Sequence, residues 1–263
     1  MRFRLAALLS CWLLLCGCQS AGGGQTRREY KQAMDSGMSA CRQNPAYCAE
    51  VAVSAGLRTT ASAGASVAGA LQVMDAVAKA RVREIMETCA NEAEFDVNLQ
   101  HFGGQPPTKE QCEEVLKRDA AGNPVLTRAM KLGQEKHVAA LRCVQLRLSV
   151  ERPGGFSLEQ RYRYDLETKV LELISKAAEL ELIRTGKTAR LKGTLVPDVV
   201  IHSGNPLRAE VGYDFKFSCP VGKSSPWHDY PRGHPYRDYN QGRIYELSLQ
   251  APVFRVSPIL GVY

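Results

Sequence analysis

Two short stretches in the second half of the chain combine acidic and basic side chains in a way that suits metal-dependent hydrolysis. A Pro-Asp pair ends at Asp198, and an Asp-Phe-Lys triplet runs from Asp214 to Lys216. Side chains alternate between the two faces of a strand, so Asp214 and Lys216 share one face. The other face is aromatic and suits a core: Tyr213, Phe215 and Phe217.

A bound cation would explain why acids are placed on a strand that is otherwise made for burial. If the two segments pair as strands, Asp198 lies near Asp214, and a divalent cation such as Mg²⁺ or Mn²⁺ relieves the repulsion between the carboxylates. Lys216 would then orient an attacking water or stabilise charge on a phosphate. The plain alternative is an Asp-Lys ion pair on an exposed edge strand, which contributes little to stability.

The surrounding sequence predicts the elements that position these residues. A Ser-Gly-Asn-Pro turn at 203–206 joins the two predicted strands, 195–202 and 207–217, in a hairpin. The other predicted elements are a helix at 124–148, a strand at 156–164, a helix at 168–185, a helix at about 238–250 and a strand at 253–257. With the 168–185 helix set aside as an insertion, the order is α-β-β-β-α-β, in an α+β fold.

This order of elements and four motifs resemble the PD-(D/E)xK nucleases, and among them the RecB-type nuclease domains. Besides the two acidic motifs, the segment 133–137 (GQEKH) is similar to a G-x-x-x-H motif and the segment 241–245 (QGRIY) to a Q-x-x-x-Y motif. The resemblance implies a restriction-endonuclease-like core over residues 121–263.

The resemblance also implies which residues bind the metal and which catalyse. His137, Asp198 and Asp214 would bind one or two Mg²⁺ or Mn²⁺ ions, and Asp198, Asp214 and Lys216 would form the catalytic group. His137 lies on the apolar stripe of its predicted helix, which directs it inward. Glu135 is the rival ligand on that helix, but it lies well off the stripe.

The later helix would serve the nucleic acid. The resemblance implies that Gln241, Arg243 and Tyr245 meet the backbone of DNA or RNA and brace the site. The loop 223–239 interleaves aromatic and basic residues that suit stacking on bases, although structural loops have a similar composition. No cysteine follows Cys219, so the iron-sulfur cluster of some relatives of this type is not expected.

The first residues of the chain predict a bacterial lipoprotein. Residues 1–18 combine a basic start, a short apolar run and a Leu-Cys-Gly-Cys ending, which resembles a lipoprotein signal peptide with lipidation at Cys18. Cys16 is the weaker choice because a large leucine precedes it. Without this leader, 32 Lys and Arg residues stand against 27 Asp and Glu residues, a mildly basic balance that permits a polyanionic partner.

A helical region is expected between the anchor and the nuclease-like domain. Residues 19–27 have the Gly-rich composition of a flexible tether, and residues 28–120 form the helical, cysteine-containing region. The segment 51–80 is rich in Ala, Gly and Ser and suits either a closely packed helix or a membrane-active segment. The even set of six further cysteines predicts disulfides, with fifteen possible pairings: Cys41, Cys48, Cys89, Cys112, Cys143 and Cys219.

This layout predicts a metal-dependent nuclease tethered to the outer membrane by lipid. It resembles polymorphic lipoprotein toxins passed between bacteria by outer-membrane exchange, which act in the cytoplasm of a recipient cell and pair with an immunity protein. The alternative is a non-enzymatic outer-membrane lipoprotein that uses a nuclease-like fold for interaction. The motifs do not distinguish DNA from RNA as the substrate, because the phosphodiester chemistry is the same.

Overall fold

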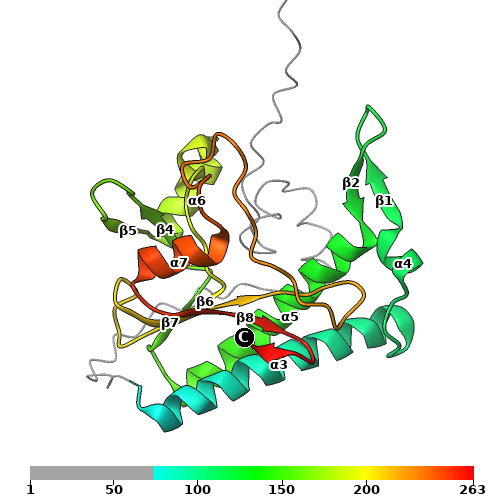
Figure 1. The fold of residues 1–263 in the computed structure, drawn as a ribbon, viewed down its shortest axis with the longest axis horizontal. Helices are drawn as coiled ribbons and strands as arrows, with labels where there is room; N and C mark the ends of the chain where they lie inside the picture. The colour runs from blue at the N-terminus through cyan, green and yellow to red at the C-terminus, as the bar shows by residue number, and fades with distance from the viewer. Residues whose placement is uncertain (1–73) are drawn as a thin grey trace, which may run out of the picture.

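The computed structural model describes residues 74–263, in which helices cover a five-stranded sheet in a mixed α+β fold (Figure 1). The expected signal peptide, Cys18, the tether, and the part of the helical region that holds Cys41 and Cys48 lie outside the described residues. Among residues 74–263, the helices are all too short or too polar to cross a membrane.

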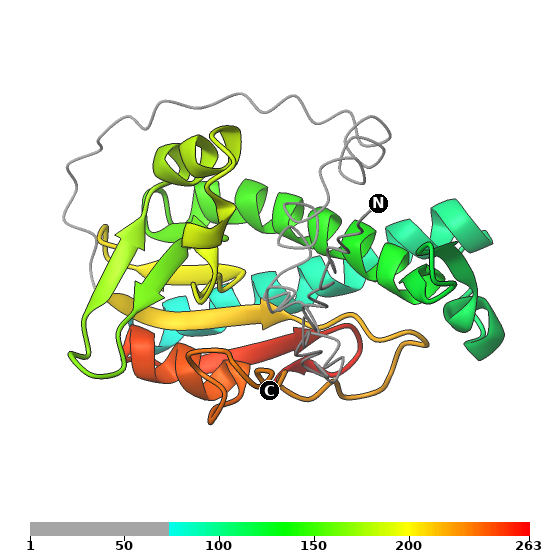
Figure 2. The ribbon, with the colours of Figure 1, turned by 90° about the horizontal axis from the view of Figure 1, so that it is seen from above.

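Two long helices, α3 (Ala76–Phe102) and α5 (Arg128–Glu151), lie against each other and against one face of the sheet (Figures 1 and 2). Helix α3 begins at Asp75, whose side chain accepts a hydrogen bond from the Ala78 amide. It ends at Gly103, which adopts the left-handed φ of 60° that favours glycine.

The start of α5 differs from the prediction. Residues 124–127 form strand β2 (Pro124–Thr127), which pairs with β1 (Val115–Arg118), and the helix begins only after Thr127. The Thr127 hydroxyl accepts a hydrogen bond from the Met130 amide and so caps the helix. The helical pattern of 124–148 could not reveal this start, because the strand exists only through its pairing with β1.

The central sheet has the strand order β3-β6-β7-β8-β9. Its strands are β3 (Phe156–Leu158), β6 (Val199–His202), β7 (Ala209–Phe215), β8 (Val253–Ser257) and β9 (Gly261–Val262). The predicted β6–β7 hairpin is confirmed as an antiparallel pair, although both strands are shorter than expected. Strands β7 and β8 are parallel, and helix α7 (Gln241–Leu249) lies between them in the chain, as parallel pairing requires a crossover.

The segment between β3 and β6 forms a second hairpin, which corrects two predictions. The expected strand 156–164 breaks at Glu159, after which β4 (Arg161–Tyr164) leaves the central sheet and pairs with β5 (Leu171–Ile174). The expected helix 168–185 is strand in its first part and helix only from α6 (Lys176–Arg184) onward, since Ser175 caps that helix. A short 3-10 turn follows at η1 (Thr188–Leu191).

The core has two parts, one on each face of the central sheet. On the face covered by α3 and α5, the alternate β7 residues Val211, Tyr213 and Phe215 are buried. On the opposite face, Tyr245 and Leu249 of α7 pack with residues of β4 and of the loop before α7. Strand β7 therefore lies between β6 and β8 with both faces covered, which places its polar residues inside the protein.

Helix α3 and the sheet share one core although they fall on different sides of the expected boundary at 120/121. That boundary lies in the turn between β1 and β2, whereas Met86 and Ala90 of α3 are buried with Val256 of the sheet. A fragment that begins at residue 121 would expose these apolar surfaces.

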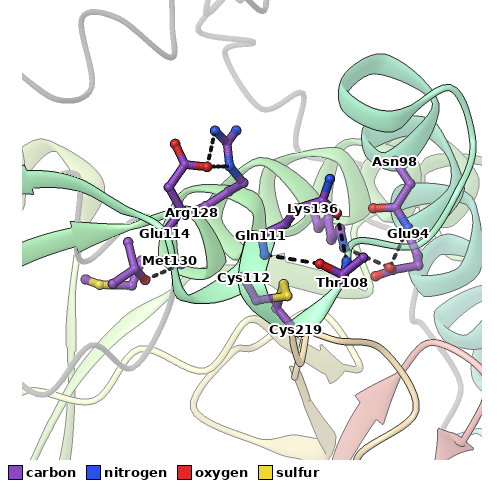
Figure 3. The surroundings of a disulfide bond; sticks show 11 residues. Glu94, Asn98, Thr108, Gln111, Cys112, Glu114, Arg128, Met130, Lys136 and Cys219 are labelled. Atoms are coloured by element: carbon purple, nitrogen blue, oxygen red, sulfur yellow. Dashed lines mark hydrogen bonds and ion pairs between the residues drawn. A yellow bond between two sulfur atoms is a disulfide. The ribbon is translucent and has the colours of Figure 1, made fainter.

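Two disulfides confirm that cysteine pairing crosslinks this fold. Cys89–Cys143 joins α3 to α5, and Cys112–Cys219 joins α4 (Lys109–Glu113) to the segment that follows β7. Figure 3 shows the second bond beside the buried ion pair between Lys136 and Glu94, whose Nζ and Oε1 atoms are 2.7 Å apart. The segment that leaves β7 is thus fixed to the helical layer.

Candidate active site

His137, Asp198 and Asp214 come from three elements and are all buried. His137 lies in the middle of α5, Asp198 directly precedes β6, and Asp214 lies on β7. The His137 Nε2 atom is 3.4 Å from Asp198 Oδ1. The other oxygen of Asp198 accepts a hydrogen bond from the Phe215 amide at 2.7 Å, so a neighbouring strand fixes the orientation of this carboxylate.

Lys216 lies against Asp214, with which it forms an ion pair. The pair is held by Gln241 of α7, whose Oε1 accepts a hydrogen bond from Lys216 Nζ at 2.7 Å. The amide nitrogen of Gln241 faces Asp214 Oδ1 at 3.4 Å and the Tyr245 hydroxyl at 3.2 Å. Because β7 is a central, buried strand, the alternative of an exposed edge-strand ion pair is wrong.

The structure places the helix α7 residues differently from what nucleic-acid contact requires. Gln241 and Tyr245 are fully buried; Gln241 contacts the Asp214–Lys216 pair, and the Tyr245 hydroxyl accepts a hydrogen bond from Gln241. Arg243 points outward, with 60% of its side chain exposed, and lies near Glu246. Arg243 is therefore the one of these three residues whose side chain is exposed to a nucleic acid in this conformation.

The Trp227 side chain lies beside Lys216 of the Asp214–Lys216 pair. Its ring centroid is 5.2 Å from Lys216 Nζ and 5.8 Å from the guanidinium carbon of Arg255, distances at which a cation is attracted to the aromatic face. The ring also lies so close to α7 that a Cβ atom added at Gly242 would be 2.3 Å from it. Elsewhere in the predicted stacking loop, Tyr230, His234 and Tyr236 are buried in the core and are not available to bases.

Glu135, the rival metal ligand on α5, is already paired with other side chains. Its carboxylate lies 2.5 Å from His101 Nε2 of α3 and 3.9 Å from Lys131 Nζ. Glu135 is thus engaged by α3 and by its own helix.

The sequence interpretation missed Glu159. It lies at the break after β3, with Oε1 3.9 Å from His137 Nε2. Its amide donates to the Asp198 carbonyl at 2.9 Å. The sequence signal was an acidic residue inside a strand predicted to be apolar. The direction of the Glu159 side chain, however, depends on where that strand breaks.

Burial and neighbouring charges perturb the ionisation of the site. Burial, together with the Lys216 charge, lowers the pKa of His137 to about 3, so its imidazole is neutral at physiological pH. Burial and the charge of Asp214 raise the pKa of Asp198 well above its ordinary value, and Glu159 adds to this. Burial also raises the pKa of Asp214, although Lys216 acts in the opposite direction.

The orphaned atoms at the site fit the chemistry of a divalent cation. His137 Nε2, Asp198 Oδ1 and Asp214 Oδ2 are buried without a hydrogen-bond partner, apart from the ion pair that Asp214 makes with Lys216. Such atoms are costly unless something else satisfies them. A neutral imidazole nitrogen and carboxylate oxygens suit Mn²⁺ and, for the oxygens, Mg²⁺.

Within residues 74–263, however, no group of three or more His, Cys, Asp or Glu side chains is arranged so that it could hold a metal ion as it stands. The contacts explain this, because the Lys216 ammonium already supplies the positive charge next to Asp214. Binding of a cation by all three predicted ligands would therefore require local movement of side chains.

No protein-family model, curated protein or solved structure matches this chain.

Proposed function

We propose that this chain is a nuclease that hydrolyses phosphodiester bonds of DNA or RNA with Mg²⁺ or Mn²⁺. The observation that carries the proposal is the convergence of His137, Asp198 and Asp214 on one buried site, where His137 Nε2 and Asp198 Oδ1 lack a hydrogen-bond partner and Lys216 pairs with Asp214. Catalytic sites commonly gather buried groups with perturbed pKa values in this way.

The order of elements supports a PD-(D/E)xK nuclease of the RecB type. Helix α5, strands β3, β6 and β7, helix α7 and strand β8 follow one another with only the β4–β5–α6–η1 segment inserted. The expected motif residues lie on these elements, with His137 on α5, Asp214 on β7 and Gln241 on α7. A restriction-endonuclease-like core accounts for both the order and the placement.

The residues would divide the work as follows. His137 through Nε2, Asp198 through Oδ1 and Asp214 through its carboxylate would hold the cation. A divalent cation at this position activates water and offsets charge on the phosphate. Lys216, held by Gln241 through Oε1, would keep its ammonium next to the reacting phosphate and stabilise the charge that develops there.

The setting that we propose is the cell envelope. A chain that is lipidated at Cys18, anchored in the outer membrane and crosslinked by disulfides would meet nucleic acid as a toxin delivered to another bacterial cell, with a cytoplasmic immunity protein protecting the producer. The two disulfides fit formation after export, since such bonds persist in oxidising compartments.

A second candidate is a non-enzymatic lipoprotein that uses this fold for interaction. The lack of a ready three-ligand metal group among the described residues favours it. The two candidates differ in whether the buried carboxylates turn over substrate.

An assay on labelled DNA and RNA separates these candidates. The full chain, oxidised and purified in detergent, should cleave at least one of the two nucleic acids with Mg²⁺ or Mn²⁺ and should stop when a chelator is added. Asp214→Asn, which keeps the size of a fully buried residue, should remove cleavage, whereas Glu135→Gln should retain it. Equal cleavage by the wild type and Asp214→Asn, or cleavage in chelator, would reject a metal-dependent nuclease that uses this site.

A further inference from the structure

Glu159 has an unusual place in the chain. Its φ of 44° lies in the left-handed region, which non-glycine residues seldom occupy and which carries a conformational cost. The chain turns here because β3 belongs to the central sheet and β4 to a different one. Glycine would make this turn without strain, so the presence of a glutamate calls for a role of its side chain.

The backbone of Glu159 is fixed on both sides. Its amide donates to the Asp198 carbonyl at 2.9 Å, and its own carbonyl accepts a hydrogen bond from Lys176 Nζ at 2.8 Å. The first bond links the turn to the residue that carries one of the site carboxylates. The carboxyl group of Glu159 is consequently held near His137 and Asp198, and its side chain is 90% buried.

The donor atoms around His137 lie within the range of separations that the ligands of one ion span. The His137 Nε2 atom is 3.4 Å from Asp198 Oδ1 and 3.9 Å from Glu159 Oε1. Two donors bound to the same octahedral cation at about 2.1 Å lie about 3.0 Å apart when adjacent and about 4.2 Å apart when opposite. Both measured separations fall between these limits.

Two independent observations point into the same space. His137 Nε2 and Asp198 Oδ1 are both buried and lack a hydrogen-bond partner, and each faces the other. The Asp214 carboxylate is occupied by Lys216 and Gln241, whereas these two atoms are engaged by neither residue. The Glu159 carboxylate, with Oε1 3.9 Å from His137 Nε2, is a further carboxylate beside these two atoms.

We propose that Glu159, His137 and Asp198 together bind one divalent cation, Mg²⁺ or Mn²⁺, next to the Asp214–Lys216 pair. This inference rests on the proposed function and deepens it, because it adds a ligand that the sequence motifs do not contain. As they stand the three groups do not form a ready metal site, so binding would require the Glu159 carboxylate to move toward the ion.

To test this inference, the chelator-treated full chain is titrated with Mn²⁺ alone, and binding is measured by calorimetry. Glu159→Gln keeps the size of the side chain and removes its charge, and we expect it to weaken Mn²⁺ binding by roughly tenfold or more. Glu135→Gln is the matched control, because it removes a nearby glutamate of α5 that pairs with His101 and should leave the affinity unchanged. Asp198→Asn should remove binding at this position.

The arms of the experiment separate the two proposals. If Asp198→Asn loses Mn²⁺ binding while Glu159→Gln binds like the wild type, the role of Glu159 is rejected and the nuclease proposal stands. If the wild type does not bind Mn²⁺, both are rejected. Glu159→Gly, which the left-handed backbone favours, replaces Glu159→Gln if the latter does not fold, and thermal unfolding without metal verifies the folded state of each variant.

Discussion

Gln241 holds Lys216 through a hydrogen bond of 2.7 Å from Lys216 Nζ to its amide oxygen. The amide nitrogen faces Asp214 and Tyr245, so this one side chain connects the acid and the base of β7 to helix α7. In this orientation the Gln241 oxygen accepts from the Lys216 ammonium and the Gln241 nitrogen faces the Asp214 carboxylate, so each donor meets an acceptor. Gln241 therefore acts as a positioning residue for the Asp214–Lys216 pair.

Gln241→Met should lower kcat for nucleic-acid cleavage by roughly tenfold or more while KM changes little, because misplacing a catalytic group slows the reaction rather than binding. Stability should fall by about 1–3 kcal/mol through the loss of buried hydrogen bonds. Arg243→Gln is the control, since its exposed charge should affect KM and not kcat. A rise in KM alone for Gln241→Met would show that Gln241 contacts the substrate instead.

Asp198→Asn should make the metal-free protein more stable and remove cleavage. The pKa of Asp198 is raised, so its contribution to stability is present below its ordinary pKa near 3.8 and is lost as the pH rises through its native pKa. The side-chain amide introduced by Asp198→Asn keeps an oxygen that can accept from the Phe215 backbone N–H, and it carries no buried charge. Thermal unfolding at pH 7.5 in chelator should show a midpoint a few degrees above the wild type; a lower midpoint would contradict the assignment.

His137 should make the folded state depend on pH in the opposite direction. Its pKa falls from about 6.5 in the unfolded chain to about 3 in the folded one, so its contribution to stability is complete above 6.5 and is lost as the pH falls toward 3. The stability difference between wild type and His137→Asn should therefore grow with pH between these values, by at most about 1.4 kcal/mol per pH unit. Denaturant titrations at several pH values measure this, and a constant difference would contradict it.

The Cys112–Cys219 bond should matter for activity more than the Cys89–Cys143 bond. Cys219 follows Lys216 by three residues, so its bond fixes the segment that carries the site lysine. Replacing either pair by alanine removes a constraint on the unfolded chain worth on the order of 4 kcal/mol. We expect similar losses of stability by denaturant unfolding, but a larger loss of kcat in the Cys112→Ala, Cys219→Ala variant; equal kcat in the two would reject this coupling.

Two glycines within the motif segments 133–137 and 241–245 should respond in opposite ways to substitution by alanine. At Gly242, a Cβ would lie 2.3 Å from the Trp227 ring, so Gly242→Ala should displace the tryptophan from Lys216 and lower both kcat and stability. At Gly133, the nearest atom outside the helix is 4.0 Å away, so Gly133→Ala should be tolerated and should stabilise α5 by up to about 1 kcal/mol. Tryptophan fluorescence should change in the first variant, and an unchanged spectrum and kcat there would contradict the packing.

Much of the candidate site could be predicted because it depends on local patterns. The period of two in β7 separates Tyr213 from Asp214, and the helical stripe of α5 directs His137 inward. The turn at 203–206 was a sufficient signal for the β6–β7 hairpin. These patterns involve neighbours in sequence, and the structure agrees with them in direction although not in every boundary.

The sequence by itself determined which side chains share a face, that the fold mixes helices and strands, and that the cysteines pair. The tertiary structure alone decided which cysteines pair, that 124–127 and 171–174 are strands, that Gln241 faces Lys216 and that Glu159 lies beside His137. The cysteine pairs and the positions of Gln241 and Glu159 depend on contacts between separate elements that form only in the folded core, and each of the two strands exists only through pairing with the neighbouring strand of its hairpin. Local periodicity cannot encode them, because it contains no information on which distant surface buries a given face.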